Sequence, residues 1–165
     1  GRRLTRSPDR RRARGRRRHE SGEAMIEICV PGIPKPGGSK RAFYNKALGR
    51  ALIVDACDNK DWKTAVKMFA VKAYQGPVLH GPLSLSIEFR MPRPKSHYRT
   101  GAHAGELKPN APMWHTSKPD RTKLVRSTED SLKGIIWADD SQVCDGRVMK
   151  IYFDPPGAAI CIEEI

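Results

Sequence analysis

Apolar and polar residues alternate along two stretches of the chain, as they do in a strand that buries one of its faces. These stretches are residues 25–30, with the sequence MIEICV, and residues 82–91, with the sequence PLSLSIEFRM. Residues 42–44 and 52–54 are also apolar and flank the turn-forming sequence NKALGR, which predicts a hairpin. The pattern therefore indicates a β-sheet with one face turned to a core.

Residues 58–74 repeat apolar residues at the spacing of an α-helix. Asp58 is the expected N-cap, and Gly76-Pro77 is the expected end. The apolar face, which we expect to pack on the core, consists of Trp62, Ala65, Val66, Phe69, Ala70 and Ala73.

Residues 118–133 form a second predicted helix, with Pro119 in its first turn and Gly134 as its stop. Its expected core-facing residues are Leu124, Val125, Thr128 and Leu132. Residues 142–153 and 158–162 then predict a closing antiparallel pair of strands. This order predicts an α+β fold: a single small domain in which a mixed β-sheet carries two main helices packed on one face.

Basic residues outnumber acidic ones by a wide margin. The 165 residues include 31 Lys+Arg and 18 Asp+Glu, which gives a formal net charge of +13. Such a surplus indicates a polyanionic partner, and nucleic acid is favoured over an anionic membrane. A basic protein with an unrelated role is the alternative that the charge leaves open.

Residues 1–24 carry ten Arg and no Lys and are almost free of apolar residues. A segment of this composition cannot form a core, so we expect it to be disordered. It is a phosphate-binding arm, a localisation-like basic tail, or sequence upstream of a natural start at Met25, and we favour the last. The folded domain is then residues 25–165.

The four cysteines form no CxxC pair, and no stretch of the chain approaches the ~20 apolar residues of a membrane-spanning helix. The thiols are then buried or incidental ones in a reducing cytosol. We expect a cytoplasmic protein that has no membrane association and needs no small-molecule cofactor.

Two irregular segments carry basic residues. The glycines of residues 31–41 either bring backbone N–H groups to a phosphate or form a plain turn, with equal weight. In residues 92–117 basic and aromatic residues are interleaved, as suits phosphate contact and base stacking. The candidate DNA-binding residues are Lys35, Lys40, Arg41, Arg93, Lys95, Arg99 and Lys118. A zinc site is not favoured, since His97, His103 and His115 lack an acidic or Cys partner at a ligand spacing.

Acidic residues gather around the second predicted helix: Asp120 precedes it and Asp139-Asp140 follow it. A metal-dependent nuclease needs carboxylates that converge on Mg²⁺ and a cation beside the phosphate, here Arg126 or Lys123. We expect the carboxylates to meet at one edge of the sheet. Taken singly, Asp120 is also explained as a helix cap and Asp139-Asp140 as a solvated turn.

This stretch resembles the RusA family of Holliday-junction resolvases, whose pattern runs approximately KPDxDNLxKxxxDALxG and then WxDDxQV. The matching residues are Lys118-Pro119-Asp120, Leu124, Asp130, Leu132, Gly134, Trp137, Asp139-Asp140 and Gln142-Val143. The opening VPGIPKPGGSKR is similar to the basic, proline-rich N-terminal segment of that family. The long segment before residue 118 is closer to the phage-encoded branch.

The resemblance implies a small homodimer, in a bacterial or phage-infected cell, that binds four-way DNA junctions by shape in recombination and repair. It implies paired symmetric nicks made with Mg²⁺, for which Mn²⁺ can substitute. By position, Asp120 and Asp140 are the implied metal ligands, with Asp139 in support. Asp130 matches the acid within the helix, and Arg126 stands where the family has its essential lysine.

The chain departs from the family pattern at one metal ligand. The second carboxylate of the pattern is Thr122 here, and the next Asn is Lys123. Either Glu129 or Asp130 compensates in a rearranged site, or Lys123 takes over the role of the lysine. Two hypotheses follow: a nuclease with an altered metal site, which we favour, and a branched-DNA-binding protein with weak or no cleavage. A ribosomal or RNA-binding module also fits the charge but leaves the acidic residues unexplained.

Overall fold

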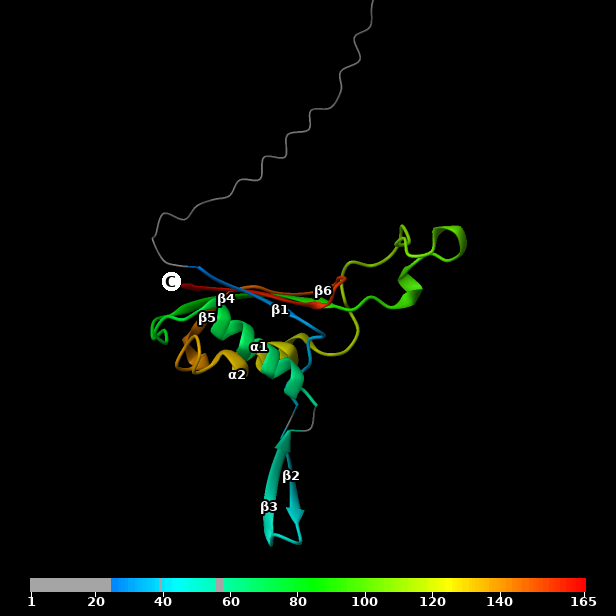
Figure 1. The fold of residues 1–165 in the computed structure, drawn as a ribbon. Coiled ribbons are helices and arrows are strands. Elements are labelled where there is room, and N and C mark those ends of the chain that lie inside the picture. Colours follow the sequence, from blue (N-terminus) through cyan, green and yellow to red (C-terminus); the bar gives the residue numbers. More distant parts are fainter. Residues whose placement is uncertain (1–24, 39, 56–57) are drawn as a thin grey trace, which may run out of the picture.

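A five-stranded sheet and two α-helices make up the body of the computed structural model, which describes residues 25–38, 40–55 and 58–165. Helices α1 (Lys60–Ala73) and α2 (Arg121–Leu132) lie side by side on the same face of this sheet (Figure 1). The predicted α+β fold with two helices on one face is confirmed. Residues 1–24, the predicted disordered arm, lie outside the described residues.

The sheet has the strand order β1-β7-β4-β5, and β6 also pairs with β4. The strands are β1 (Ile26–Pro31), β4 (Leu83–Met91), β5 (Val143–Asp145), β6 (Val148–Tyr152) and β7 (Gly157–Glu164). Strand β7 is antiparallel to both β1 and β4, whereas β5 and β6 are parallel to β4, so the sheet is mixed.

The predicted closing antiparallel pair is wrong. Strands β6 and β7 flank β4 on opposite sides and do not pair with each other. The apolar residues of β7 are buried because this strand lies between β1 and β4, a position that the local sequence does not reveal. Gly146 separates β5 from β6, and an added Cβ there would overlap the Leu85 carbonyl, so only glycine lets the chain pass this close to β4.

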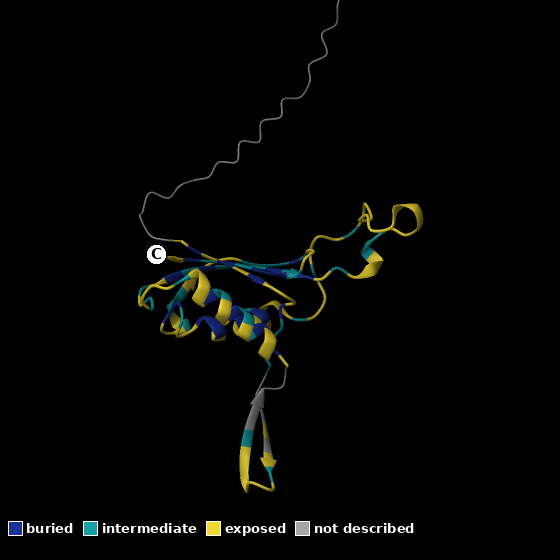
Figure 2. Ribbon diagram, in the orientation of Figure 1, coloured by how far each residue is buried: buried dark blue, intermediate teal, exposed yellow. Residues whose placement is uncertain are grey.

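The core lies between the sheet and the two helices. Alternate residues of β1 and β4 face it, and the same alternation leaves the other side of the sheet exposed or half-buried (Figure 2). Trp62 of α1 and Leu124 and Leu132 of α2 are buried against this face, as is Trp137 just after α2. Each such side chain contributes about 1.5–3 kcal/mol relative to an exposed one.

The helix ends differ from the predicted ones by one to three residues. Asn59 rather than Asp58 is the N-cap of α1, and its buried side chain donates hydrogen bonds to Pro36 O (3.1 Å) and Ser127 Oγ (3.4 Å). Helix α2 begins after Asp120, so Pro119 lies outside the helix rather than in its first turn. Gly134, with φ +78°, ends it as predicted.

Two segments project from the body. The predicted hairpin is present as β2 (Lys40–Asn45) and β3 (Arg50–Asp55), which stand away from the helices (Figure 1). Residues 92–117 project near the end of β6 and contain only the short 3-10 turns η1 (Lys95–His97) and η2 (Gly101–His103). Neither described α-helix has the length and apolar character that crossing a membrane requires.

Candidate metal centre and DNA interface

Asp120 lies at the N-terminus of α2 with its carboxylate exposed. It occupies the N-cap position, yet its side chain accepts no capping hydrogen bond and instead pairs with Lys123 Nζ at 3.3 Å. The positive end of the helix dipole favours a carboxylate at this position. The explanation of Asp120 as an ordinary helix cap therefore does not hold, and the carboxylate is available to a ligand.

Lys150 fixes the backbone that carries Asp120. Its ammonium group donates hydrogen bonds to Ser117 O (2.6 Å) and Pro119 O (2.7 Å), on either side of the cis peptide bond. Burial lowers the pKa of Lys150, and the Asp120 charge opposes that change. Lys150 was not among the predicted site residues. The one signal in the sequence is a lysine at an inward-facing position of the strand VMKIY.

Asp139 has a structural role at the other end of α2. Its carboxylate accepts a hydrogen bond from Ser141 N (3.0 Å), and its own N–H donates to Gln142 Oε1 (2.8 Å), which forms a capping box. The Lys133 ammonium is also bonded to it, and these contacts hold the pKa of Asp139 well below its usual range. The Asp139 carboxylate is thus already bonded to other residues of the same chain.

Asp140 is oriented by a tryptophan and lies near other acids. Trp137 Nε1 donates a hydrogen bond to Asp140 Oδ1 at 2.9 Å. Burial raises the pKa of Glu129, and the charges of Asp140 and Asp130 raise it further. Asp130 in turn pairs with Lys63 at 3.4 Å. Asp140 and Glu129 are therefore close enough to interact electrostatically, and carboxylate oxygens are the ligands that a divalent cation prefers.

The structure does not bring Asp120 and Asp140 together within one chain. Helix α2 separates them, and its 12 residues span about 18 Å at 1.5 Å per residue. The sheet gives the same separation: Lys150, beside Asp120, pairs with Phe89, whereas Val143, beside Asp140, pairs with Leu83 at the opposite end of β4. In the described chain no three His, Cys, Asp or Glu side chains converge as metal ligands.

The expectation that these carboxylates meet at one edge of the sheet is therefore wrong for a single chain. Helix α2 begins near one end of β4, beside Lys150, and ends near the other, beside Val143, so the residues before and after the helix lie at opposite ends of that strand. The sequence places both carboxylates next to the helix, but the length of the helix keeps them apart.

The solvent side of α2 is divided by charge. Thr122, Arg126, Glu129 and Lys133 follow one another on the face opposite the buried Leu124 and Thr128. The N-terminal half of the helix carries the bases Arg121, Lys123 and Arg126, and the acids Glu129, Asp130, Asp139 and Asp140 lie at or beyond its C-terminal half. Each end of α2 thus holds one of the candidate carboxylates with a different set of neighbours.

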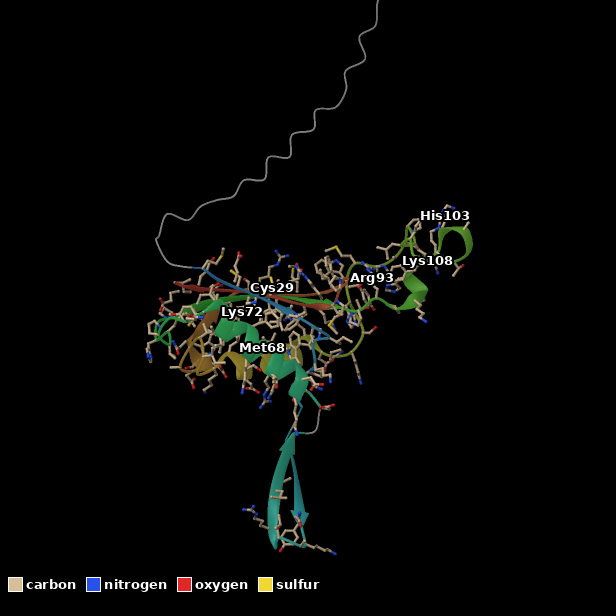
Figure 3. All side chains as sticks on the ribbon, in the orientation of Figure 1. Cys29, Met68, Lys72, Arg93, His103 and Lys108 are labelled. Carbon is tan, nitrogen blue, oxygen red and sulfur yellow. The ribbon has the colours of Figure 1, made fainter. Side chains whose placement is uncertain are left out.

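Three of the predicted DNA-binding cations are engaged by other parts of the chain. Lys35 pairs with Asp58 (3.9 Å) and Asp61 (3.8 Å), and Arg99 pairs with Glu106 at 3.1 Å. Arg93 lies where residues 92–117 leave the sheet (Figure 3), and it donates hydrogen bonds to Pro112 O (2.9 Å) and Tyr152 O (3.3 Å). Lys95 and Lys118 are exposed. The side chains of Lys40 and Arg41 lie outside the described residues.

Two histidines anchor residues 92–117 to the body. His97 and His115 both contact the Tyr152 ring, with centroid separations of 4.7 and 4.6 Å. The Nδ1 atoms of both are buried without a hydrogen-bond partner. Burial lowers the pKa of His115, and the Lys150 charge lowers it further. His103 lies at the far end of the segment, so the three histidines do not form a common metal site (Figure 3).

Known proteins share this sequence pattern. The family endodeoxyribonuclease RusA matches residues 31–163, which include both ends of α2. The uncharacterized protein YqaN of Bacillus subtilis (strain 168) is 30% identical over 145 residues, an alignment that covers 85% of this chain and 96% of that protein. The family consists of endodeoxyribonucleases that act on branched DNA and generally depend on a divalent metal. With the fold, the α2 motif and this match in agreement, the chain belongs to the endodeoxyribonuclease RusA family.

Proposed function

We propose that this protein is a metal-dependent, structure-selective endodeoxyribonuclease that resolves four-way DNA junctions by paired symmetric nicks, and that it acts as a homodimer. Family membership supports the class of reaction. The observation that carries the dimer is the separation of the two candidate carboxylates by the length of α2. A site that needs both must take one of them from a second chain.

The residues at both ends of α2 fit a divalent cation such as Mg²⁺ or Mn²⁺. Asp140 and Glu129 both offer carboxylate oxygens at the C-terminal end of α2. Burial raises the pKa of Glu129, and the charges of Asp140 and Asp130 raise it further, a repulsion that a bound cation relieves. Asp120 is exposed and accepts no capping bond. When bound, the ion polarises the phosphodiester and acidifies the attacking water.

The remaining residues position these ligands and the phosphate. The Trp137 N–H holds Asp140 in place, and Lys150 holds the turn before Asp120. Lys123 lies beside Asp120, and Arg126 one turn further along the solvent side of α2. Their cationic groups supply the charge that neutralises the phosphate as the bond breaks.

Antiparallel pairing of α2 with α2 of a second chain joins the two halves of the site. A two-fold axis at the middle of the helix places its basic N-terminal half against the acidic C-terminal half of the partner helix. Each interface then contains two copies of the same complementary contact. Asp120 of each chain lies near Asp140 of the other, so one dimer holds two sites, as paired nicking of a symmetric junction requires.

Mixing two inactive variants tests this arrangement. Asp120→Asn and Asp140→Asn should each lower Mg²⁺-dependent cleavage of a labelled junction by roughly 10²–10³-fold, the usual scale for losing one preorganised electrostatic group. Refolding the two together should restore nicking, because each mixed dimer has one site with both carboxylates. Those dimers should nick one strand only.

Glu163→Gln is the matched control, since Glu163 is exposed on β7 away from α2. It should cleave like the unmodified chain. Full cleavage in EDTA, or by either single variant, would contradict the metal site. Cleavage by the unmodified chain without rescue in the mixture would mean that both carboxylates act within one chain.

A non-catalytic junction-binding protein is the second candidate, and Thr122 favours it. A hydroxyl stands where the family pattern has a carboxylate, and an uncharged hydroxyl binds Mg²⁺ weakly. This candidate predicts junction binding without nicks in any divalent metal. The same gel separates the two, because bound and nicked junctions migrate differently.

A further inference from the structure

The β2–β3 hairpin, called the blade below, projects from a root that consists of residues 35–38 and 58–61. The root is bonded to α2. On one side, Gly37 N donates a hydrogen bond to Lys123 O at 2.7 Å, three residues before β2 begins. On the other side, Asn59 bonds to Pro36 O and Ser127 Oγ. Lys35 pairs with Asp58 and Asp61 across this root. The residues on both sides of the hairpin are therefore bonded to the first two turns of α2.

No other described helix or strand packs extensively against the blade. The extensive contacts of β2 and β3 are with each other alone. An isolated two-stranded hairpin is only marginally stable in water. Its turn is nevertheless ordered, since Asn45 Oδ1 accepts hydrogen bonds from Ala47 N (3.0 Å) and Leu48 N (3.2 Å). An ordered hairpin that packs on no other part of its own chain is typical of an element that binds a partner molecule.

The exposed side chains of the blade suit nucleic acid. Tyr44 is 65% exposed, and its cross-strand neighbour is the small Ala51, which leaves the ring open. Lys46 and Arg50 are exposed beside it. Across residues 40–55 there are two Lys and two Arg against one Asp. Aromatic rings stack on unpaired bases, and cations hold the adjoining phosphates.

We propose that the hairpin inserts Tyr44 among the bases at the open centre of a branched DNA substrate, while Lys46 and Arg50 contact the phosphates around it. The root ties the hairpin to α2 one turn beyond Asp120, so DNA held by the blade is presented to the candidate metal site. Linear duplex has no unstacked bases to offer, and the contact therefore selects branched DNA. This inference rests on the proposed function.

Binding in EDTA tests the hairpin without cleavage. The full chain and its Tyr44→Ala, Tyr44→Phe and Met68→Ala variants are titrated with a four-way junction that carries 2-aminopurine at the crossover, and with a linear duplex of the same sequence. Tyr44→Ala should lose about tenfold in junction affinity, the scale of one base–aromatic contact, with its duplex affinity unchanged. Tyr44→Phe keeps the ring and should bind like the unmodified chain.

Met68 provides the control because it is an exposed apolar residue on α1, remote from the hairpin (Figure 3). The 2-aminopurine fluorescence should change with every protein except Tyr44→Ala. Equal junction affinity for Tyr44→Ala, or an equal loss on duplex, would overturn the proposal. So would dissociation of the Tyr44→Ala dimer in sedimentation, since the hairpin would then bind a second chain. If the unmodified chain bound junction and duplex equally well, the proposed function and this inference would both be overturned. If the chain cleaved junctions and Tyr44→Ala bound them with unchanged affinity, this inference alone would be overturned.

Discussion

Thr122 lies in the first turn of α2, two residues beyond Asp120, and is exposed on the solvent side of the helix. A carboxylate at this position would add a second negative charge to the first turn of the helix, close in sequence to Asp120. The charge count of a site governs how tightly it holds a hard cation. Thr122 is therefore the position at which a substitution has most reason to change the metal affinity of the proposed site.

Replacing Thr122 with Asp should strengthen metal binding. We expect the Mg²⁺ concentration for half-maximal junction cleavage to fall about tenfold, which corresponds to 1.4 kcal/mol of added binding. A Mg²⁺ titration of cleavage measures it. Thr64→Asp, at an exposed threonine of α1, is the matched control and should change nothing. An unchanged Mg²⁺ dependence in Thr122→Asp would mean that the hydroxyl is not the weak point of the site.

Some site residues can be recognised from the sequence and others cannot. Asp120 and Asp140 belong to a contiguous motif, so their identity follows from local spacing. Glu129 lies in the same motif and is an alternative that the sequence already offers, whereas Lys150 joins the candidate site through tertiary packing, because it reaches the turn before Asp120 from a strand 30 residues later in the chain. The role of Arg93 is also tertiary, since it bonds to backbone 19 residues away. Asp139 is held by local contacts, a capping box with Gln142 and a bond to Lys133.

At the scale of elements, residues 92–117 depend on an aromatic contact for their attachment. His97 and His115 contact Tyr152, and Arg93 lies over the same ring at 5.7 Å from its centroid. Burial lowers the pKa of His115, and the nearby Lys150 charge lowers it further. A proton added to His115 would therefore be placed in a buried position that already faces a cation.

This arrangement predicts a pH-dependent stability. The pKa of His115 in the folded chain lies below its ordinary value of 6.5, so the unfolded chain takes up the proton first as the pH falls. The contribution of neutral His115 is complete above about pH 6.5 and is lost as the pH falls through the folded pKa. Urea unfolding at pH 7.5 and 5.5 measures it, and His115→Phe should lose less stability between the two.

His80→Phe is the control for this measurement, since His80 is exposed and lies outside the Tyr152 contact. Its loss of stability on acidification should equal that of the unmodified chain. An equal loss in His115→Phe would contradict the assignment. Hydrogen exchange of the amides in residues 95–117 gives a local check, because opening of this segment precedes global unfolding.

The types of the helices and of most strands follow from periodicity, and their ends do not. The alternation in β4 and the helical spacing in α1 and α2 reflect one buried face each, which the sequence displays directly. The N-cap of α1 is Asn59 because it is buried and bonded to two other segments, whereas Asp58 is exposed and pairs with Lys35. Tertiary contacts therefore determine which of the two adjacent residues, Asp58 or Asn59, occupies the N-cap position.

At the scale of the whole molecule, the proposed dimer depends on the division of charge along α2. In antiparallel pairing Arg126 faces Glu129 of the second chain, and the two-fold axis repeats this contact. Arg126→Glu or Glu129→Arg alone should place like charges together twice and weaken the dimer by tenfold or more, roughly 1.4 kcal/mol at least. The double variant restores both pairs and should recover the dimer. Sedimentation equilibrium measures all three.

Lys67→Glu controls for the change in net charge, because Lys67 is exposed on α1. It should leave the dimer intact. Single variants that dimerise as tightly as the unmodified chain would exclude pairing along this face. Recovery in the double variant is the more specific result, since a general loss of stability would not be reversed by a second substitution.

The fold class was predictable and the order of strands was not. The order of strands and helices along the chain favours a sheet that is covered by helices. The position of β7 was missed because neighbouring strands in a sequence usually pair, and the link through Asp154 to Pro156 has the composition of a tight turn. Instead the link carries the chain past the end of β4 to the far side of that strand.

That position has a consequence for synthesis. Strand β7 is the last strand described, yet it supplies the backbone partner of both β1 and β4. Until it leaves the ribosome, a nascent chain holds two strands with unpaired edges and an open core. The sheet must therefore close after translation of nearly the whole domain, through contacts between its first and last strands. A chain assembled this way completes its sheet only after both helices have been translated.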